Sequence, residues 1–141
     1  MGKTNTLAVL LAALAGMIIG FLWYGALFQE QWMAGNGITE SGGKMFKGGK
    51  EMDMSPLPML LNFACMFVYA FLLNWLQNSM GVSTWQGGAK VGAVVGLMVS
   101  LSAILGHLFA QSPGQLSLVD GSFALVLFTV IGAVVGARRR R

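Results

Sequence analysis

Four long apolar stretches constrain the fold of this chain more than any other feature. They lie at residues 7–28, 57–76, 91–110 and 116–137, and none contains a lysine, an arginine or a glutamate. A helix that crosses a bilayer needs about 20 predominantly apolar residues, and each stretch supplies that length. The sequence therefore predicts an all-α polytopic membrane protein, a four-transmembrane-helix bundle that forms a single integral membrane domain over residues 1–141.

The composition agrees with a location in a bilayer. Only 10% of the 141 residues are charged, whereas soluble domains carry about 25%. The first stretch follows Lys3 in the manner of a signal peptide, but a secretory apolar core ends after about 7–15 residues. Here the apolar run continues for twelve residues beyond the cleavage-like segment 13–16. We therefore expect the first stretch to be retained as a span.

The distribution of basic residues predicts the orientation of the spans. With four spans, both termini and the second loop share one side, which has six basic residues and no acid: Lys3, Lys90, Arg138, Arg139, Arg140 and Arg141. The first loop, residues 29–56, has three lysines and four acids. Because cytoplasmic loops are enriched in Lys and Arg, we expect both termini in the cytoplasm and the protein in a bacterial inner membrane. The arginine tail then serves as a topology anchor on lipid headgroups.

The loop at 29–56 is rich in glycine and methionine and is expected on the outer side. Its spaced apolar residues predict short interfacial helices. The glycine pairs at 42–43 and 48–49 argue against one long helix.

Glycines recur at helical spacing in three of the four spans. In lipid, small residues mark the places where helix backbones approach closely. The positions are Gly16 and Gly20 in the first span, Gly88, Gly92 and Gly96 along the third, and Gly132 and Gly136 in the fourth. This pattern predicts a tightly packed bundle, in which some of the glycines serve contacts between subunits.

Four polar residues converge on the outer third of the predicted bundle. His107 lies near the end of the third span and Asp120 near the start of the fourth, while Glu30 ends the first span and Asn62 lies just inside the second. At 100° per residue His107 falls within about 20° of Gly96, so its side chain is expected inside the bundle. Ionisable residues in spans are costly and often functional. The cluster is therefore a candidate pocket for a ligand or for protons.

A purely structural interpretation of these residues remains open. Charge near the headgroups costs little, a carboxylate in a first helical turn is stabilised by the helix dipole, and His107 can form a hydrogen bond across helices.

The sequence lacks the residues that several classes of function require. The single histidine excludes a haem held by two histidines, and the single cysteine, Cys65, excludes a disulfide or a CxxC motif. No HExxH, GxSxG, P-loop or dinucleotide-binding pattern occurs. We therefore predict no catalytic residue, no metal, no cofactor and no nucleic-acid partner.

The end of the first span resembles a bacterial family of small four-helix membrane proteins that is classed as a domain of unknown function. That family has Trp-Tyr-x-x-Leu-Phe followed by a Trp, here Trp23, Tyr24, Leu27, Phe28 and Trp32. A proline is common after its Trp-Tyr pair, where this chain has Gly25-Ala26. The resemblance implies the fold and a membrane location, but no activity.

Two functions of different classes follow from these patterns. The first is non-enzymatic: a small membrane protein that acts through helix contacts, as a homo-oligomer or as an accessory subunit of a membrane complex, with the bilayer as its other partner. The alternative is binding or transport of a small solute or a proton through His107, Asp120, Glu30 and Asn62. A membrane enzyme that uses His107 as a general base ranks third.

Overall fold

The computed structural model describes residues 5–137, and within them it contains the predicted all-α bundle. Four helical segments are long and apolar enough to cross a membrane. They are α1 (Thr6–Leu22) with its continuation η1 (Trp23–Leu27), α3 (Leu57–Met80), α4 (Trp85–Phe109) and α5 (Gly114–Ala137). The arginine tail, predicted to be a topology anchor, lies outside the described residues.

Local sequence accounts for where these helices begin and end. The side chain of Asn5 accepts a hydrogen bond from the backbone of Ala8 at the start of α1, and Thr84 caps α4 in the same way. Gly81 ends α3 with a φ of 70°, a left-handed conformation that glycine adopts readily. Both α3 and α4 extend further toward their shared connection than hydropathy predicted, because polar residues there continue the helices past the apolar stretch.

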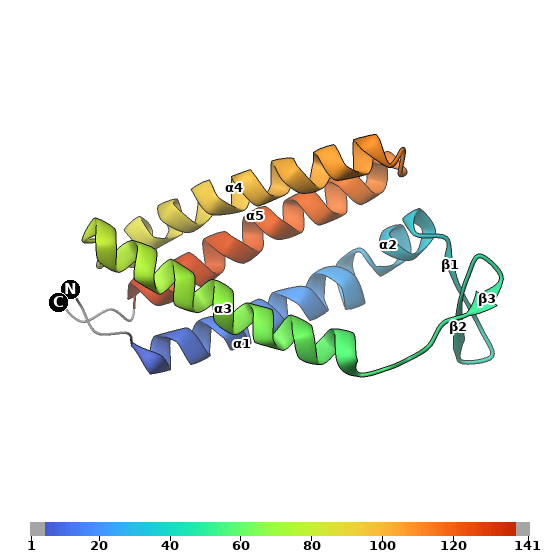
Figure 1. Ribbon diagram of the computed structural model, residues 1–141, viewed down its shortest axis with the longest axis horizontal. Helices are drawn as coiled ribbons and strands as arrows, with labels where there is room; N and C mark the ends of the chain where they lie inside the picture. Colours follow the sequence, from blue (N-terminus) through green and yellow to red (C-terminus); the bar gives the residue numbers. More distant parts are fainter. Residues whose placement is uncertain (1–4, 138–141) are drawn as a thin grey trace.

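Helix α5 is the centre of the bundle. In Figure 1, α4 and α5 run side by side, while α1 and α3 cross each other on the opposite side of α5. The apolar core joins α1, α3 and α5 through residues such as Ala12, Met66 and Ile131, each at most 2% exposed. This core fills the middle of the bundle.

Glycines bring α4 and α5 into backbone contact within one chain. A Cβ atom added at Gly92 would lie 2.0 Å from the carbonyl oxygen of Phe128, and one added at Gly132 would lie 2.3 Å from that of Gly88. Only residues without a Cβ permit this approach. The close contacts recur along the crossing, at Gly88, Gly92, Gly96, Gly132 and Gly136.

The two glycines of α1 lie in different surroundings. A Cβ at Gly16 would meet the sulfur of Met66 at 2.8 Å, so Gly16 packs against α3. A Cβ at Gly20 would meet nothing within 4 Å. Gly20 therefore lies beside open space.

The first loop contains one short helix and a small sheet, where the sequence predicted only short helices. Helix α2 (Gln29–Gly35) follows the first span, and β1 (Ile38–Ser41), β2 (Lys44–Lys47) and β3 (Lys50–Glu51) form an antiparallel sheet in that order. The glycine pairs do not simply interrupt helices. They have positive φ angles of 58–80°, which suit the two-residue turns of hairpins.

The sheet lies beyond one end of the bundle, and we call this the loop end (Figure 1). Helix α1 begins and α5 stops at the opposite end. The ends of α4 and η1 and the start of α5 all meet at the loop end.

Candidate functional site

His107 and Asp120 are in direct contact at the loop end. His107 lies in the last turn of α4, and its Nε2 is 2.6 Å from Oδ2 of Asp120 on α5. The tight α4–α5 connection, in which the backbone of Ser112 donates to the carbonyl of His107, sets both residues at similar depth. A contact of this length between a ring nitrogen and a carboxyl oxygen requires a proton between them. His107 can supply it as the Nε2–H tautomer or as the imidazolium.

The second oxygen of Asp120 binds Tyr24. The Tyr24 hydroxyl donates to Oδ1 at 2.6 Å, across 96 residues of sequence. Tyr24, Asp120 and His107 thus form a polar triad in which one carboxylate accepts hydrogen bonds from two other segments. Sequence reasoning missed Tyr24 as a site residue, since its position at a span end is typical of an interfacial aromatic residue.

A π-helical segment directs Tyr24 and its neighbour Trp23 toward α5. In η1 the backbone N–H of Phe28 donates to the carbonyl of Trp23, five residues earlier, and this wider turn rotates the chain less per residue than an α-helix does. Adjacent residues can therefore both reach α5. The indole of Trp23 donates to the Val119 carbonyl and the Ser122 hydroxyl, each at 3.2 Å.

The polar triad is partly exposed. The side chains of His107 and Asp120 are 22% and 24% exposed. On the other side, toward the middle of the bundle, lie the buried residues Leu127 and Ile131. The triad thus lies partly open near the loop end, and the apolar core lies between it and the opposite end.

One structural explanation for Asp120 is removed by the helix boundary. Helix α5 begins at Gly114, and no acidic residue lies in its first turn. Asp120 is six residues further on, so it cannot cap the exposed N–H groups. Its stabilisation comes from Tyr24 and His107 instead.

The structure does not join all four residues of the predicted cluster. Glu30 lies on α2 and is exposed. Asn62 is exposed on α3, and its Nδ2 donates to the sulfur of Met17 at 3.7 Å. Among the described residues, no hydrogen bond links Glu30 or Asn62 to His107 or Asp120.

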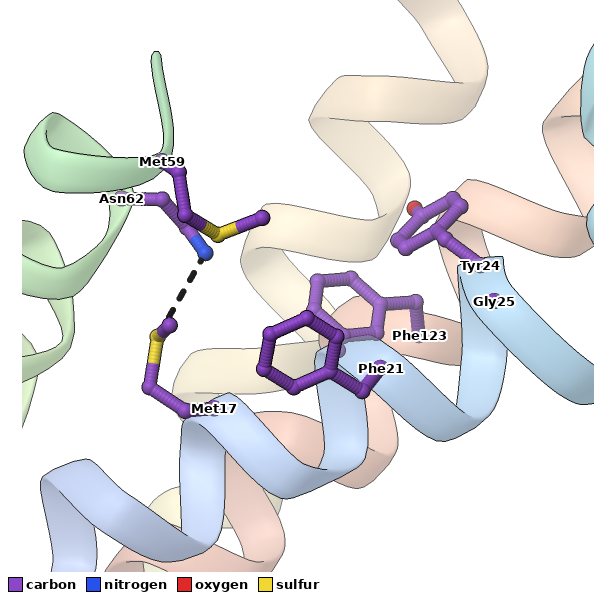
Figure 2. Close-up of a pocket in the computed structure, with 8 residues that line it drawn as sticks. Met17, Phe21, Tyr24, Gly25, Met59, Asn62 and Phe123 are labelled. Atoms are coloured by element: carbon purple, nitrogen blue, oxygen red, sulfur yellow. Dashed lines mark hydrogen bonds between the residues drawn. The ribbon is translucent and has the colours of Figure 1, made fainter. Parts of the chain in front are cut away.

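Asn62 instead borders a cleft that Tyr24 also borders. This cleft has a volume of about 370 Å³. Figure 2 shows Met59 and Asn62 projecting from α3 toward α1, with Phe21, Tyr24 and Phe123 on the facing side. The full lining consists of Met17, Gly20, Phe21, Tyr24, Gly25, Met59, Asn62 and Phe123. Tyr24 thus belongs to both the cleft and the polar triad, and its ring is held by Phe123 at a centroid distance of 4.9 Å.

A metal centre finds no support in the described part of the chain. No group of three or more His, Cys, Asp or Glu side chains is close enough there to hold an ion. The triad contributes one carboxylate and one imidazole, whose facing atoms already bind each other.

Comparison with curated proteins gives no match, and comparison with solved structures gives none either. The family comparison does give a match. The model of the DUF1761 family, whose description is "protein of unknown function", matches residues 7–136. The match runs from the first span to the end of the fourth. This match confirms the resemblance to an uncharacterised family, and the chain belongs to the DUF1761 family.

Proposed function

We propose that the protein binds a proton or a small polar solute at the polar triad. The observation that carries this proposal is the double engagement of Asp120, whose two oxygens accept 2.6 Å hydrogen bonds from His107 and Tyr24. An imidazole beside a carboxylate changes its charge when one proton is taken up. The pair is not sealed inside the bundle, because about a fifth of the His107 side chain is exposed.

A packing role alone accounts less well for this arrangement. Hydrogen bonds between membrane helices need only neutral groups such as Ser, Thr or Asn. An ionisable pair in a span is energetically costly, and such residues in membrane proteins mark functional sites as a rule. The chain places its only histidine against the only aspartate of its four spans, and a tyrosine completes the set.

Binding at one end fits the geometry better than conduction through the bundle. A path from the triad to the opposite end would cross the core, where Leu127 and Ile131 are at most 2% exposed. Among the described residues, the buried side chains of the interior are mostly apolar, and Ser100, Asn74 and Gln77 are the polar exceptions. We therefore favour uptake and release at the loop end.

Assembly through helix contacts ranks below this function. The sequence argument for assembly was the glycine pattern, and five of these glycines are engaged between α4 and α5 of the same chain. The pattern is explained without a second subunit. Assembly stays a proposal that the mass of the purified protein would test.

The test of the triad uses the single histidine. We would label the protein with ¹⁵N-histidine and record its ring resonances in bilayers, where one residue supplies all signals. When the Asp120 carboxylate accepts the hydrogen bond, Nε2 of His107 must carry a proton. The ring is then either the neutral Nε2–H tautomer or the imidazolium. In Asp120→Asn, an amide NH2 group replaces one of the two carboxylate oxygens, so either His107 or Tyr24 faces a donor in place of an acceptor. We expect altered ring shifts.

Glu30→Gln is the matched control, because it makes the same chemical change on the exposed helix α2. It should leave the His107 resonances unchanged. Equal effects of Asp120→Asn and Glu30→Gln, or none from either, would overturn the proposal. Tyr24→Phe should also shift the His107 signals, since the carboxylate loses its second donor.

We also propose that both termini face the cytoplasm of a bacterial inner membrane. The asymmetry of lysine and arginine between the loops supports this orientation. In a Cys65→Ser background, an impermeant maleimide added to whole cells should label Ser41→Cys and spare Ser83→Cys. The reverse labelling would contradict the orientation.

A further inference from the structure

We propose that the cleft between α1, η1, α3 and α5 binds a neutral amphiphile from the bilayer, with an apolar body and a hydroxyl head group. This inference rests on the proposed function, because Tyr24 belongs to both sites. It assigns a ligand class, an alcohol or a phenol, and a binding site separate from the His107–Asp120 contact.

The size and lining of the cleft suit a small apolar molecule. Its volume of about 370 Å³ falls within the range of roughly 300–1,000 Å³ for small-molecule pockets. Aromatic rings and thioethers form most of the wall, from Phe21, Phe123, Met17 and Met59. Methionine side chains adapt their shape to a ligand.

Access to the cleft is from the side of the bundle. It lies between α1 and α3, two helices that are apolar enough to span the membrane, and its lining residues Phe21 and Met59 are 57% and 49% exposed. A molecule dissolved in the bilayer can therefore enter without crossing water. Gly20 borders this space, since a Cβ at that position would meet no atom within 4 Å.

The hydrogen-bonding capacity of the two polar residues selects the head group. The O–H of Tyr24 is already donated to Asp120, so Tyr24 offers a ligand only the lone pairs of its oxygen. The head group must therefore donate a hydrogen bond. A hydroxyl does so, whereas an ether or a ketone has no proton to give.

Asn62 supplies the complementary contact. Its Nδ2 donates to the sulfur of Met17 at 3.7 Å, and a thioether is a weak acceptor that a hydroxyl oxygen can replace. Figure 2 shows this amide nitrogen directed across the cleft toward α1. The cleft thus offers a ligand an acceptor at Tyr24 and a donor at Asn62.

Anionic amphiphiles are disfavoured by charge. The Asp120 carboxylate lies 2.6 Å behind the Tyr24 oxygen, so a carboxylate or sulfate at the head-group position would face a like charge in a region of low dielectric. This distinguishes the proposed ligand from a fatty acid. It also distinguishes the site from a groove that holds any acyl chain.

Photolabelling tests the head-group selection on the wild-type protein. We would incorporate the full chain into phosphatidylcholine nanodiscs, label it with a decan-1-ol that carries a mid-chain diazirine, and map the insertion by mass spectrometry. We expect insertion into the segments around Met17 and Met59. Unlabelled decan-1-ol should compete, while decyl sulfate and decane should compete at least about tenfold less well. Equal competition by decane would identify an acyl-chain groove and overturn the proposal, and equal competition by decyl sulfate would also overturn it.

Two variants with a matched control test the location. Gly20→Leu fills the cleft and should abolish labelling, whereas Gly106→Leu, another helical glycine with no atom within 4 Å of its Cβ position, should not. Tyr24→Phe removes the acceptor oxygen and should weaken binding about three- to tenfold, as expected for one hydrogen bond. Labelling that survives Gly20→Leu would overturn the proposal.

The outcomes separate this inference from the proposed function. If Gly20→Leu abolishes labelling while Asp120→Asn leaves the His107 resonances unchanged, the cleft stands and the triad proposal fails. If the His107 resonances respond but the decan-1-ol inserts elsewhere, the triad stands and the cleft proposal fails.

Discussion

Replacing Gly92 by alanine tests how tightly α4 and α5 are packed. The added Cβ would lie 2.0 Å from the carbonyl oxygen of Phe128 and 2.8 Å from its carbon. These are backbone atoms of α5, so no side chain can rotate away. Ordinary van der Waals contact begins at 3.4 Å, and the two helices must therefore separate by about 1.4 Å at this point.

The expected loss of stability follows from this displacement. Inserting a methyl group into a well-packed core typically costs about 1–3 kcal/mol. A shift of the helix axes also loosens the neighbouring contacts at Gly88 and Gly132, so we expect the upper part of that range, about 3 kcal/mol. Alanine favours the helix over glycine by up to about 1 kcal/mol, which leaves a net destabilisation of about 2 kcal/mol.

The measurement is reversible unfolding in mixed dodecylmaltoside and SDS micelles, followed by far-ultraviolet circular dichroism. The control is Gly106→Ala, on the same helix, where a Cβ would meet nothing within 4 Å. It should be neutral or slightly stabilising. Equal unfolding free energies for the two variants would refute the backbone contact. A change in molecular mass without a loss of stability would move the contact to an interface between subunits.

Three further perturbations have clear expectations. Gln77→Met removes the amide that donates to the Gly132 carbonyl at 3.0 Å from a fully buried position, and should lower the free energy of unfolding by about 1 kcal/mol in the same assay. Gly43→Val, at a φ of 77°, should destabilise the hairpin by about 1–2 kcal/mol; hydrogen exchange should then accelerate over residues 38–51 and stay unchanged in the spans. Cys65 is exposed in the middle of α3, so a charged maleimide should label it in SDS but not in bilayers, since thiolate forms only in contact with water.

The polar triad contains one contact that local sequence patterns predicted and one that they did not. The His107–Asp120 contact spans 13 residues across one short connection, and helical phase together with hairpin geometry predicted that the two lie at similar depth. Tyr24 is 96 residues from Asp120. Its contact depends on how the first span lies against α5, and a single sequence contains no signal for that.

Glu30 illustrates the opposite case, in which a local pattern misled. The sequence placed it at the end of the first span, in one cluster with His107 and Asp120. The structure ends that helix at Phe28, where φ is −127° and ψ is 23°, after the π-helical turn. Residue spacing counted at 100° per residue fails beyond such a break, and Glu30 lies on the separate helix α2.

Hydropathy by itself determined the number of spans and their approximate limits, because the bilayer requires about 20 apolar residues in a row and this requirement is local. Glycine spacing in the third and fourth spans likewise indicated the faces along which α4 and α5 approach, whereas Gly20 in the first span borders open space. Only the tertiary structure decided that those faces meet within one chain, that Tyr24 completes the triad, and that a cleft opens beside it. Each of these depends on the relative placement of distant segments, which arises from packing summed over the whole bundle.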